Sequence, residues 1–389
     1  MYRLLKTIRE TNSTEVIREK TLMENKNPHN ITDNQTEEKI RYGEKLYERV
    51  KNSETGKSFN RAVKRVNNSK KKKLQAIAII TFVAAYGLFS LFISLNEKFW
   101  HIKGVPGWHD LFVAAGLSDS AYTGNLGDIA VHYIDVEQGD SALIIADDKT
   151  ILIDGGEVSA FSAVSNYLKS LKIDRLDYVI ASHPHSDHIG SLGKVIDFFG
   201  TDTLIMPEVT NEMTPVTSSY ENMIDAADNC GAEIHYAEIG STITVSEGCT
   251  LDILAPVKDY DDYNNYSIVC RFNYGETSFL FTGDIEEKAE RDILESGTDV
   301  SATVLKVAHH GSSTSSIKAF LQAVDPDYAV ISVGSPNDYG HPHKETLKLL
   351  ELLDIEVYRT DLHGNIVLFS DGKEITAVKE KSTDKNVYR

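Results

Sequence analysis

The residues best suited to chemistry lie together in one short segment, which reads His183-Pro184-His185-Ser186-Asp187-His188. This segment follows an apolar, strand-like run and precedes a helical one, so it forms the turn between them. Such a turn can direct His183 and His185 to one side and Asp187 and His188 to the other. Imidazole nitrogens and carboxylate oxygens in this arrangement can hold two metal ions, and they suit zinc, with manganese or iron as alternatives. A polar loop with solvated histidines is the structural alternative, but so dense a cluster favours a metal site.

Three weaker signals repeat the same placement. Asp154, Asp284 and the pair His309-His310 each follow an apolar, strand-like run. Taken singly, each has an ordinary explanation, such as a helix cap or turn for an aspartate and a hydrogen-bonded core residue for a histidine. Taken together, polar residues at the tips of several apolar strands indicate one shared edge. Asp154 precedes two glycines and is placed to orient a metal ligand from behind.

Candidate catalytic and substrate-binding residues surround this predicted centre. Asp187 and His341 are the predicted catalytic residues, because His341 can donate a proton to a leaving oxygen or hold a phosphate. His343 can assist in the same loop, although an exposed helix-entry loop is the alternative for both histidines. Ser312 and Lys306 flank the histidine pair and are predicted to contact an anionic substrate.

The elements that must position these residues begin after residue 128. Strand-like runs occupy 129–136, 141–147 and 150–156, followed by a helical run at 161–172 and a buried strand at 176–183. A second half adds a cluster of strands and then strands that alternate with helices. Two such halves predict one layered domain of the α/β (α+β) class over residues 128–380.

The chain before this domain has a different character. Residues 74–95 form a run of 22 residues without a formal charge, which spans roughly 33 Å as a helix and is long enough to cross a bilayer. Four lysines at 70–73 precede it, as on the cytoplasmic side of a membrane span. We therefore expect a cell-membrane protein with a single span and a cytoplasmic N-terminus. Residues 1–73 are predicted to be a polar, basic, disordered tail, residues 96–127 a linker, and the domain extracytoplasmic.

Charge and composition exclude several classes of protein. The net charge is −18, but residues 1–73 hold 19 basic and 10 acidic residues, which leaves the remainder at −27. So acidic a body should not bind duplex DNA stably, and a short or small phosphodiester is the expected substrate. A chain with 41% hydrophobic residues is neither wholly disordered nor fibrous, and three cysteines without a CxxC spacing do not form a zinc ribbon.

The order of the motifs carries a family resemblance. Asp154-Gly155-Gly156, the 183–188 segment, Thr282-Gly283-Asp284 and His309-His310-Gly311-Ser312 resemble the metallo-β-lactamase superfamily. The stretch DVEQGDSALI at 135–144 and later blocks are similar to the extracytoplasmic domain of the DNA-uptake protein family ComEC. The resemblance covers about residues 128–372, and it implies a four-layer αββα sandwich with a dinuclear metal site.

The resemblance also implies a set of metal ligands. Its members are His183 and His185 for the first metal, Asp187 and His188 for the second, Asp284 as the bridge, and His310, or alternatively His309, to complete the second site. Asp154 would support a ligand from behind. The family's usual third histidine on the first metal has no clear counterpart, because the one histidine between Ile189 and Ala308 is His235, inside an apparent strand.

The expected activity is metal-dependent hydrolysis. Two divalent ions with a bound hydroxide suit cleavage of a phosphodiester, as in a nuclease or phosphodiesterase. The alternatives are hydrolysis of an ester, lactam or lactone on the same centre, and a non-catalytic binding domain that keeps the fold. The oligomeric state and the physiological substrate have no signal in the sequence.

Overall fold

The computed structural model describes residues 52, 57, 70–96, 105, 127–383 and 385–389. The predicted tail at 1–73 and the predicted linker at 96–127 lie almost wholly outside these residues, so both remain predictions. Contacts divide the chain into two units, Met1–Phe89 and Ser90–Arg389, which are described separately.

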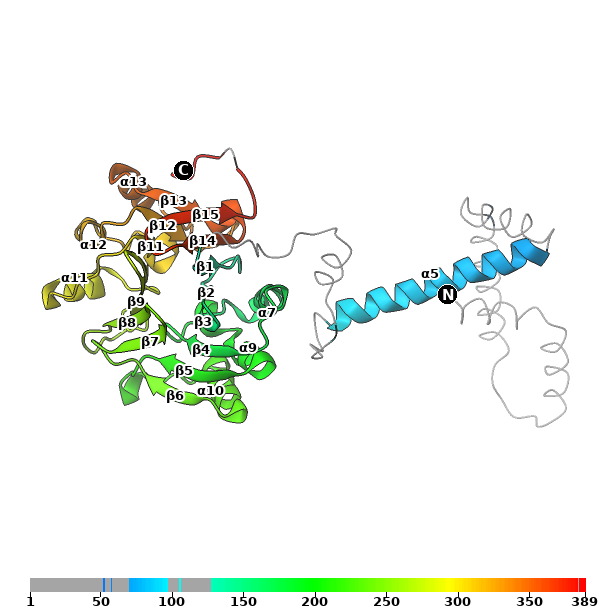
Figure 1. Ribbon diagram of the computed structural model, residues 1–389, viewed down its shortest axis with the longest axis horizontal. Coiled ribbons are helices and arrows are strands. Elements are labelled where there is room, and N and C mark those ends of the chain that lie inside the picture. Colours follow the sequence, from blue (N-terminus) through cyan, green and yellow to red (C-terminus); the bar gives the residue numbers. More distant parts are fainter. Residues whose placement is uncertain (1–51, 53–56, 58–69, 97–104, 106–126, 384) are drawn as a thin grey trace, which may run out of the picture. The chain divides into compact units, whose positions relative to one another are not determined.

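The apolar run near residue 80 is helical. Helix α5 spans Lys70–Leu95 and begins in the cluster of four lysines (Figure 1). Large apolar side chains along it are exposed, with Phe82 at 72% and Leu88 at 69%. Within the described part of the chain, no helix combines the length and the apolarity needed to cross a bilayer. The membrane span therefore stays a prediction.

Two β-sheets form the centre of the second unit. The first sheet has the strand order β15 (Ile375–Lys379), β14 (Ile366–Ser370), β1 (Ile129–Tyr133), β2 (Ala142–Ala146), β3 (Lys149–Ile153), β4 (Leu176–Ile180), β5 (Thr201–Met206) and β6 (Glu233–Tyr236). The second has the order β13 (Glu356–Arg359), β12 (Tyr328–Ile331), β11 (Val304–Lys306), β10 (Thr277–Phe281), β9 (Val269–Tyr274), β8 (Cys249–Ala255) and β7 (Thr242–Ser246).

The alternation of side chains along each strand produces the layers. On β1, Val131 and Tyr133 enter the core between the sheets, whereas Ala130 lies on the opposite face. On β10, Phe279 and Phe281 enter the same inner core, and Leu280 packs on the outer side of its sheet. Apolar residues on both faces of a strand require cover on both sides, which a sheet and a layer of helices supply.

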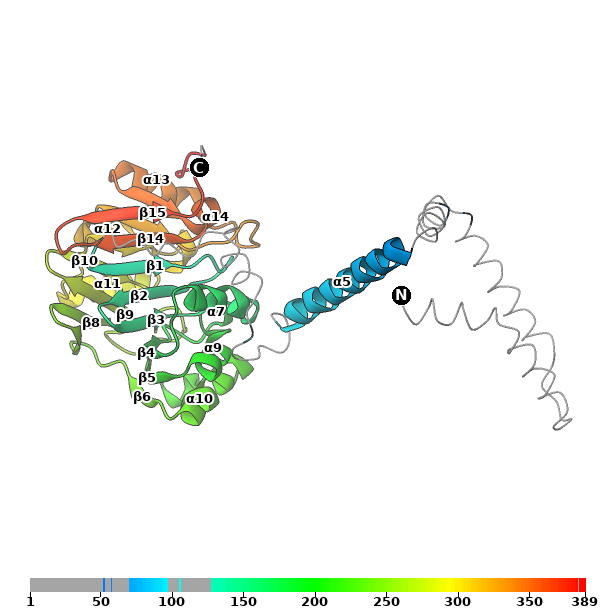
Figure 2. The same ribbon diagram turned by 45° about the vertical axis from the view of Figure 1, so that its right-hand side comes forward.

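Helices cover the outer faces of both sheets (Figures 1 and 2). Against the first sheet pack α7 (Phe161–Ser170), α9 (Leu192–Phe199) and α10 (Ser218–Cys230), with buried Val164, Leu168, Val195, Ile196 and Met223. Against the second pack α11 (Glu287–Ser296), α12 (Lys318–Val324) and α13 (Lys344–Leu352), with buried Ile293, Phe320, Leu321 and Leu347. The predicted αββα sandwich is confirmed.

The direction of the strands brings the motifs together. Strands β3 to β6 run parallel, as do β10 to β13. The carboxyl ends of parallel strands meet at one edge of a sheet, where ligands bind in open α/β folds. Asp154 follows β3, the His183 turn follows β4, Asp284 follows β10, and the short turn η4 (Ala308–Gly311) follows β11.

Candidate metal centre

A short turn after β4 positions the first group of histidines. Helix α8 (Ser186–Ile189) is a single turn with His185 as its N-cap. His183 and His188 are fully buried, whereas His185 and Asp187 are partly exposed. The segment therefore presents side chains at two depths, but the grouping differs from the predicted one: His183 is buried with His188, and His185 is partly exposed with Asp187.

The turn η4 positions the second pair of histidines by adopting an unusual backbone. His309 and His310 have φ angles of 50° and 52°, in the left-handed region. A non-glycine residue there costs about 1–2 kcal/mol, so two in succession persist only where other contacts hold them. The main-chain N–H of His309 donates to the carbonyl oxygen of Gly283 at 3.1 Å, and His310 Nδ1 lies 2.9 Å from the carbonyl oxygen of Ser332. These contacts hold both imidazoles next to Asp284.

Four side chains form the centre of the site: Asp187, His188, Asp284 and His310, which each offer an atom within 4.8 Å of the others. His188 Nε2 lies 3.2 Å from Asp284 Oδ1, and His310 Nε2 lies 3.3 Å from Asp187 Oδ2 and 3.5 Å from Asp284 Oδ2. Nevertheless, His188 Nε2, Asp284 Oδ1 and His310 Nε2 are shielded from solvent and have no well-directed hydrogen-bond partner among the described residues. Buried polar atoms that converge without bonding to one another fit a divalent cation between them.

The charges at this centre also fit a cation. Burial lowers the pKa of His188, but Asp284 and Asp154 outweigh burial and bring that pKa well above its usual value. For His310, burial is likewise outweighed by Asp284 and Asp140, which raise its pKa to about 10. Burial raises the pKa of Asp284, yet His188 and His310 bring it well below its usual range. Protons on the imidazoles thus balance a surplus of carboxylates, and a metal ion can take over that role.

Two carboxylates hold the buried imidazoles from behind. Asp154 Oδ2 lies 2.8 Å from His188 Nδ1, as the sequence predicted for Asp154. Asp140 Oδ1 lies 3.2 Å from His310 Nδ1, and Asp140 Oδ2 lies 2.7 Å from the ammonium of Lys306. Carboxylates in this position fix the orientation of a ligating imidazole and increase its basicity. The role of Asp140 was not predicted, although it lies in the 135–144 block that carries the family resemblance.

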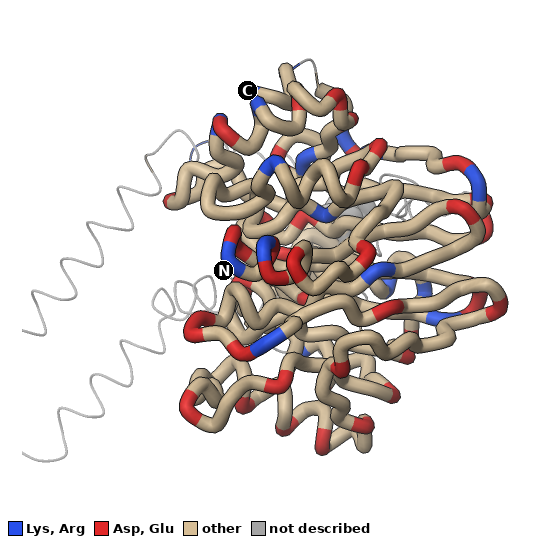
Figure 3. Tube along the Cα trace, turned by 90° about the vertical axis from the view of Figure 1, so that its left-hand side faces the viewer, with Lys and Arg blue, Asp and Glu red and all other residues tan. Residues whose placement is uncertain are grey.

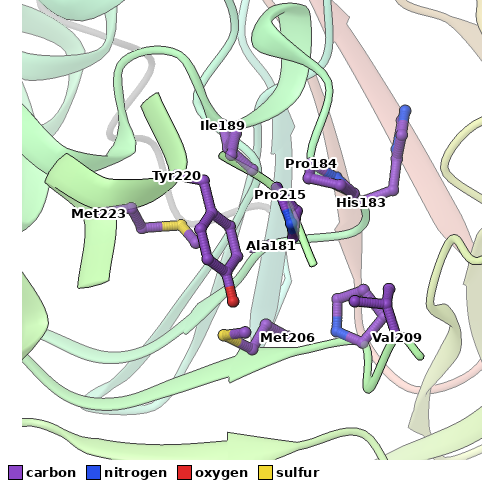
Figure 4. A pocket seen from close by; sticks show the side chains of 10 residues that line it. Ala181, His183, Pro184, Ile189, Met206, Val209, Pro215, Tyr220 and Met223 are labelled. Atoms are coloured by element: carbon purple, nitrogen blue, oxygen red, sulfur yellow. The ribbon is translucent and has the colours of Figure 1, made fainter. Parts of the chain in front are cut away.

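His183 and His185 lie next to this cluster. His183 Nε2 is 3.0 Å from His185 Nδ1. A small apolar recess adjoins the turn (Figure 4), and it is lined by Ala181, His183, Pro184, Ile189, Met206, Pro207, Val209, Pro215, Tyr220 and Met223. Burial, and next the charge of His188, bring the pKa of His183 well below its usual value, so His183 is neutral. Burial also lowers the pKa of His185. Neutral imidazole is the form that binds metals, so both residues fit the first metal.

His310 rather than His309 belongs to the buried cluster. His310 is 1% exposed, whereas the side chain of His309 is 21% exposed. His309 Nε2 lies 3.8 Å from Asp284 Oδ2, and its Nδ1 lies 3.3 Å from Glu286 Oε1. The geometry therefore favours His310 as the ligand and leaves His309 at the wall of the cleft above it.

Two residues predicted to contact substrate lie away from the cleft. Lys306 is 3% exposed, and besides pairing with Asp140 it donates to the carbonyl oxygen of Val307 at 3.0 Å. Ser312 is also 3% exposed, and its hydroxyl lies 3.0 Å from Thr314 Oγ1. The structure corrects both assignments. Proximity to the histidine pair in sequence did not reveal that these side chains are buried, Lys306 at the end of β11 and Ser312 directly after η4.

His341 and His343 differ in their surroundings. His341 lines the cleft, with its ring 5.5 Å from that of His309. Burial, assisted by His310 and His309, lowers the pKa of His341 to about 4, so it is neutral at pH 7. His343 instead accepts the main-chain N–H of Ser313 at 2.9 Å and holds the loop. Of the two, His341 is therefore placed to meet a substrate.

A cleft of about 310 Å³ opens over the centre, with His185, Asp187, Asp284, His309, His310 and His341 among its lining residues. A neighbouring chamber of about 250 Å³ shares Gln138, Glu157, Asp187 and Tyr339 with it. Among the residues that the structure describes, no lysine or arginine lines either chamber. Acidic residues also outnumber basic ones along the trace of this unit (Figure 3). Positive charge for an anionic substrate would therefore come from the imidazoles of the centre or from a metal ion that replaces their protons.

Comparisons with known proteins agree with this site. The family model described as the metallo-beta-lactamase superfamily matches residues 134–335. ComE operon protein 3 of Bacillus subtilis (strain 168) is 30% identical over 256 residues, which cover 61% of this chain and 32% of that protein. Competence protein ComA of Neisseria gonorrhoeae is 30% identical over 265 residues, which cover 67% of this chain and 35% of that protein. This chain thus spans about a third of the length of the curated relatives that it matches.

The chain is also similar to a solved structure. The metallo-beta-lactamase fold protein YhfI of Bacillus subtilis has 16% sequence identity and a TM-score of 0.41, over 59% of this chain and 96% of that one. The family model, by contrast, matches more than half of this chain and includes Asp154, the His183 turn, Asp284 and His310. The chain therefore belongs to the metallo-β-lactamase superfamily.

Proposed function

We propose that this chain is a metal-dependent phosphodiesterase that acts on short or single-stranded substrates. The observation that carries the proposal is the combination of a buried His/Asp cluster with a cleft that has no lysine or arginine in its lining among the described residues. Such a cleft offers one place for negative charge, directly over the cluster. A single phosphodiester needs one such place, whereas an extended polyanion needs several.

The residues of the chain would divide the work as follows. Divalent cations, expected to be zinc, manganese or iron, would when bound supply an activated water and neutralise charge on phosphoryl oxygens. Burial raises the pKa values of Asp284 and Asp187, but His188 and His310 bring both below their usual range. Both carboxylates would therefore stay ionised, hold the cations and accept hydrogen bonds from water. His341 is neutral at pH 7, so its ring N–H would donate a hydrogen bond to a phosphate oxygen. A neutral imidazole is less suited to transfer a proton to the leaving oxygen.

The same cleft argues against a lactam substrate that carries a carboxylate near the reacting bond. That carboxylate would meet Glu157, Asp187 and Asp338 in the neighbouring chamber. Like charges there oppose binding. The salt dependence of DNA binding should accordingly be shallow, with a slope of roughly −1 to −2, because few phosphates are neutralised.

We further propose that residues 74–95 anchor the chain in the cell membrane, with the N-terminus in the cytoplasm and the hydrolase domain outside. The lysines at 70–73 and the apolar composition of α5 support this orientation. The name of one further relative, Recombination protein 2 of Haemophilus influenzae, is consistent with a nucleic-acid substrate. Protease added to intact cells should then cleave the domain and spare an N-terminal tag.

One comparison of substrates tests the activity. The purified full chain, loaded with Mn²⁺ or Zn²⁺, is assayed on bis(p-nitrophenyl) phosphate and labelled single-stranded DNA, and in parallel on nitrocefin and a lactone. Chelated protein and His185→Ala serve as controls. We expect turnover of the phosphodiesters alone, which both controls abolish. Turnover of the lactam or lactone without any phosphodiester hydrolysis would contradict the proposal.

A further inference from the structure

The first metal lacks an assigned third protein ligand. His235 was the one histidine in the right part of the sequence, but the structure places it on β6, with its side chain 57% exposed. Its Nε2 lies 3.1 Å from the exposed carboxylate of Glu233, and it does not line the cleft. The ligand that completes a site with His183 and His185 must therefore come from another element.

Asn264 lines the same cleft as His185. It belongs to the loop between β8 and β9 and lines the cleft together with His185 and Asp284. Its side-chain oxygen, Oδ1, is shielded from solvent and has no hydrogen-bond partner among the described residues. The preceding residue, Tyr263, packs its ring edge-on against His185, with centroids 5.7 Å apart. A buried amide oxygen without a partner costs free energy unless something binds it.

The neighbouring Asn265 shows that an unpartnered side-chain oxygen is not a general property of this loop. Asn265 donates to both carboxylate oxygens of Asp262, at 2.9 and 2.8 Å, and its Oδ1 accepts the main-chain N–H groups of Glu286 and Ala289 at 3.1 Å. Asn265 thus fastens the loop to the start of α11 with every polar group of its side chain in use. The anchored loop presents Asn264 to the cleft, so its unpaired oxygen is not the result of a loose segment.

We propose that Asn264 Oδ1 is the third protein ligand of the first metal, beside His183 and His185. The inference rests on the metal centre and does not depend on which substrate is hydrolysed. An amide oxygen is a harder, neutral donor than the imidazole that it replaces, and hard oxygen donors suit Mn²⁺ better than they suit Zn²⁺. The first site should therefore be the weaker of the two for zinc and should tolerate manganese well.

Metal binding, rather than activity, provides the test. The full chain is stripped of metal and titrated with Mn²⁺ and with Zn²⁺ by calorimetry, and bound Mn²⁺ is also counted by electron paramagnetic resonance. In Asn264→Ala the weaker site should lose at least roughly 10- to 100-fold in affinity for either metal, the loss typical even of residues that only support a ligand. The tighter site should bind as before. Asn211→Ala, at an exposed position outside the cleft, is the matched control and should bind as the wild type does.

Two further substitutions keep the inference testable if the alanine variant does not fold. Asn264→Asp retains an oxygen donor and should restore Mn²⁺ binding, whereas Asn264→His supplies the family's usual nitrogen and should shift preference towards Zn²⁺. If Asn264→Ala binds metal with the stoichiometry and affinity of the wild type, Asn264 is not a ligand. The same conclusion follows if the aspartate and histidine variants have equal ratios of Mn²⁺ to Zn²⁺ affinity. Failure of phosphodiester hydrolysis alone would refute the proposed substrate and leave this ligand untouched.

Discussion

A substitution of Lys306 distinguishes a structural role of this side chain from a role in substrate binding. Its ammonium lies 2.7 Å from Asp140 Oδ2, and the side chains are 3% and 8% exposed. Asp140 in turn lies 3.2 Å from His310 Nδ1. Replacing Lys306 with methionine preserves most of the volume of the side chain but leaves Asp140 buried beside His310 without its ammonium partner.

The size of the effect follows from this geometry. At 2.7 Å and an effective dielectric constant of about 20, the gross attraction is about 6 kcal/mol, which desolvation of both groups offsets in large part. Removing one partner of a buried pair typically costs about 3–5 kcal/mol, and the lower end is expected here because the His310 imidazole remains 3.2 Å from Asp140. For a domain of this size the corresponding fall in Tm is on the order of 10 °C. The burial of Asp140 opposes its ionisation, and Lys306 is the main reason that the pKa of Asp140 falls to about 2.

The assay is thermal and urea unfolding of the metal-free full chain, with exposed Lys348→Met on α13 as the matched control. The double variant Lys306→Met/Asp140→Asn should be less destabilised than the sum of its two single variants by about 1–3 kcal/mol, because neither charge is then left alone. A Lys306→Met protein that unfolds like the wild type but has a higher KM would contradict the structural role and restore the predicted substrate contact.

Three other outcomes follow from the described residues. Glu290→Gln should lower the free energy of unfolding in urea by about 1–3 kcal/mol, because buried Glu290 accepts the main-chain N–H groups of Ser316 and Ile317 and an amide can accept only one of them. His132 is buried and its pKa falls to about 3, so the folded state stays neutral while the unfolded state gains a proton below pH 6.5. The contribution of His132 to the free energy of unfolding should therefore fall by about 1.4 kcal/mol per pH unit from pH 6.5 towards pH 3. Urea titrations in chelator at pH 7.5 and pH 5 measure this fall. Between these two pH values, His132→Gln should lose about 2 kcal/mol less stability than the wild type. An identical pH dependence in both proteins would contradict the assignment. His341→Ala should lower kcat roughly 10- to 100-fold at unchanged metal content, as expected for a lost hydrogen bond to a charged group, and the wild-type pH–rate profile should show no limb from this residue near pH 6.5. If His341→Ala instead lowers the metal content, His341 is a metal ligand and the proposed contact with substrate is wrong.

The sequence was most informative where chemistry depends on short spacing. The segment from His183 to His188 predicted its own turn, and the apolar strands before Asp154, Asp284 and His310 predicted the edge at which these residues meet. These predictions succeeded because the direction of a strand and the position of its end are local properties, readable from alternation and turn residues.

Contacts between distant residues were harder to predict. Nothing in the sequence near Lys306 indicates that Asp140 will neutralise it, since Lys306 ends β11 in the second sheet and Asp140 lies in the loop before β2 of the first. The helices α10 and α11 were also missed, because each buries only three residues, so the apolar pattern is faint among polar neighbours. The proposed replacement of the third histidine by Asn264 follows no spacing rule, because it depends on how one loop packs against α11.

The pairing of β1 with β14 constrains the order in which the domain can assemble. These strands are adjacent in the first sheet although one lies near the start of the domain and the other near its end. Just beyond β1, the main-chain N–H of Asp135 donates to Asn365 Oδ1 across 230 residues of intervening chain. While the ribosome is still producing the second half, β1 has β2 on one side and an unpaired edge on the other. Completion of the first sheet must therefore wait for nearly the whole domain to be synthesised, and a chain that stops before residue 366 keeps an open edge on which other strands can pair.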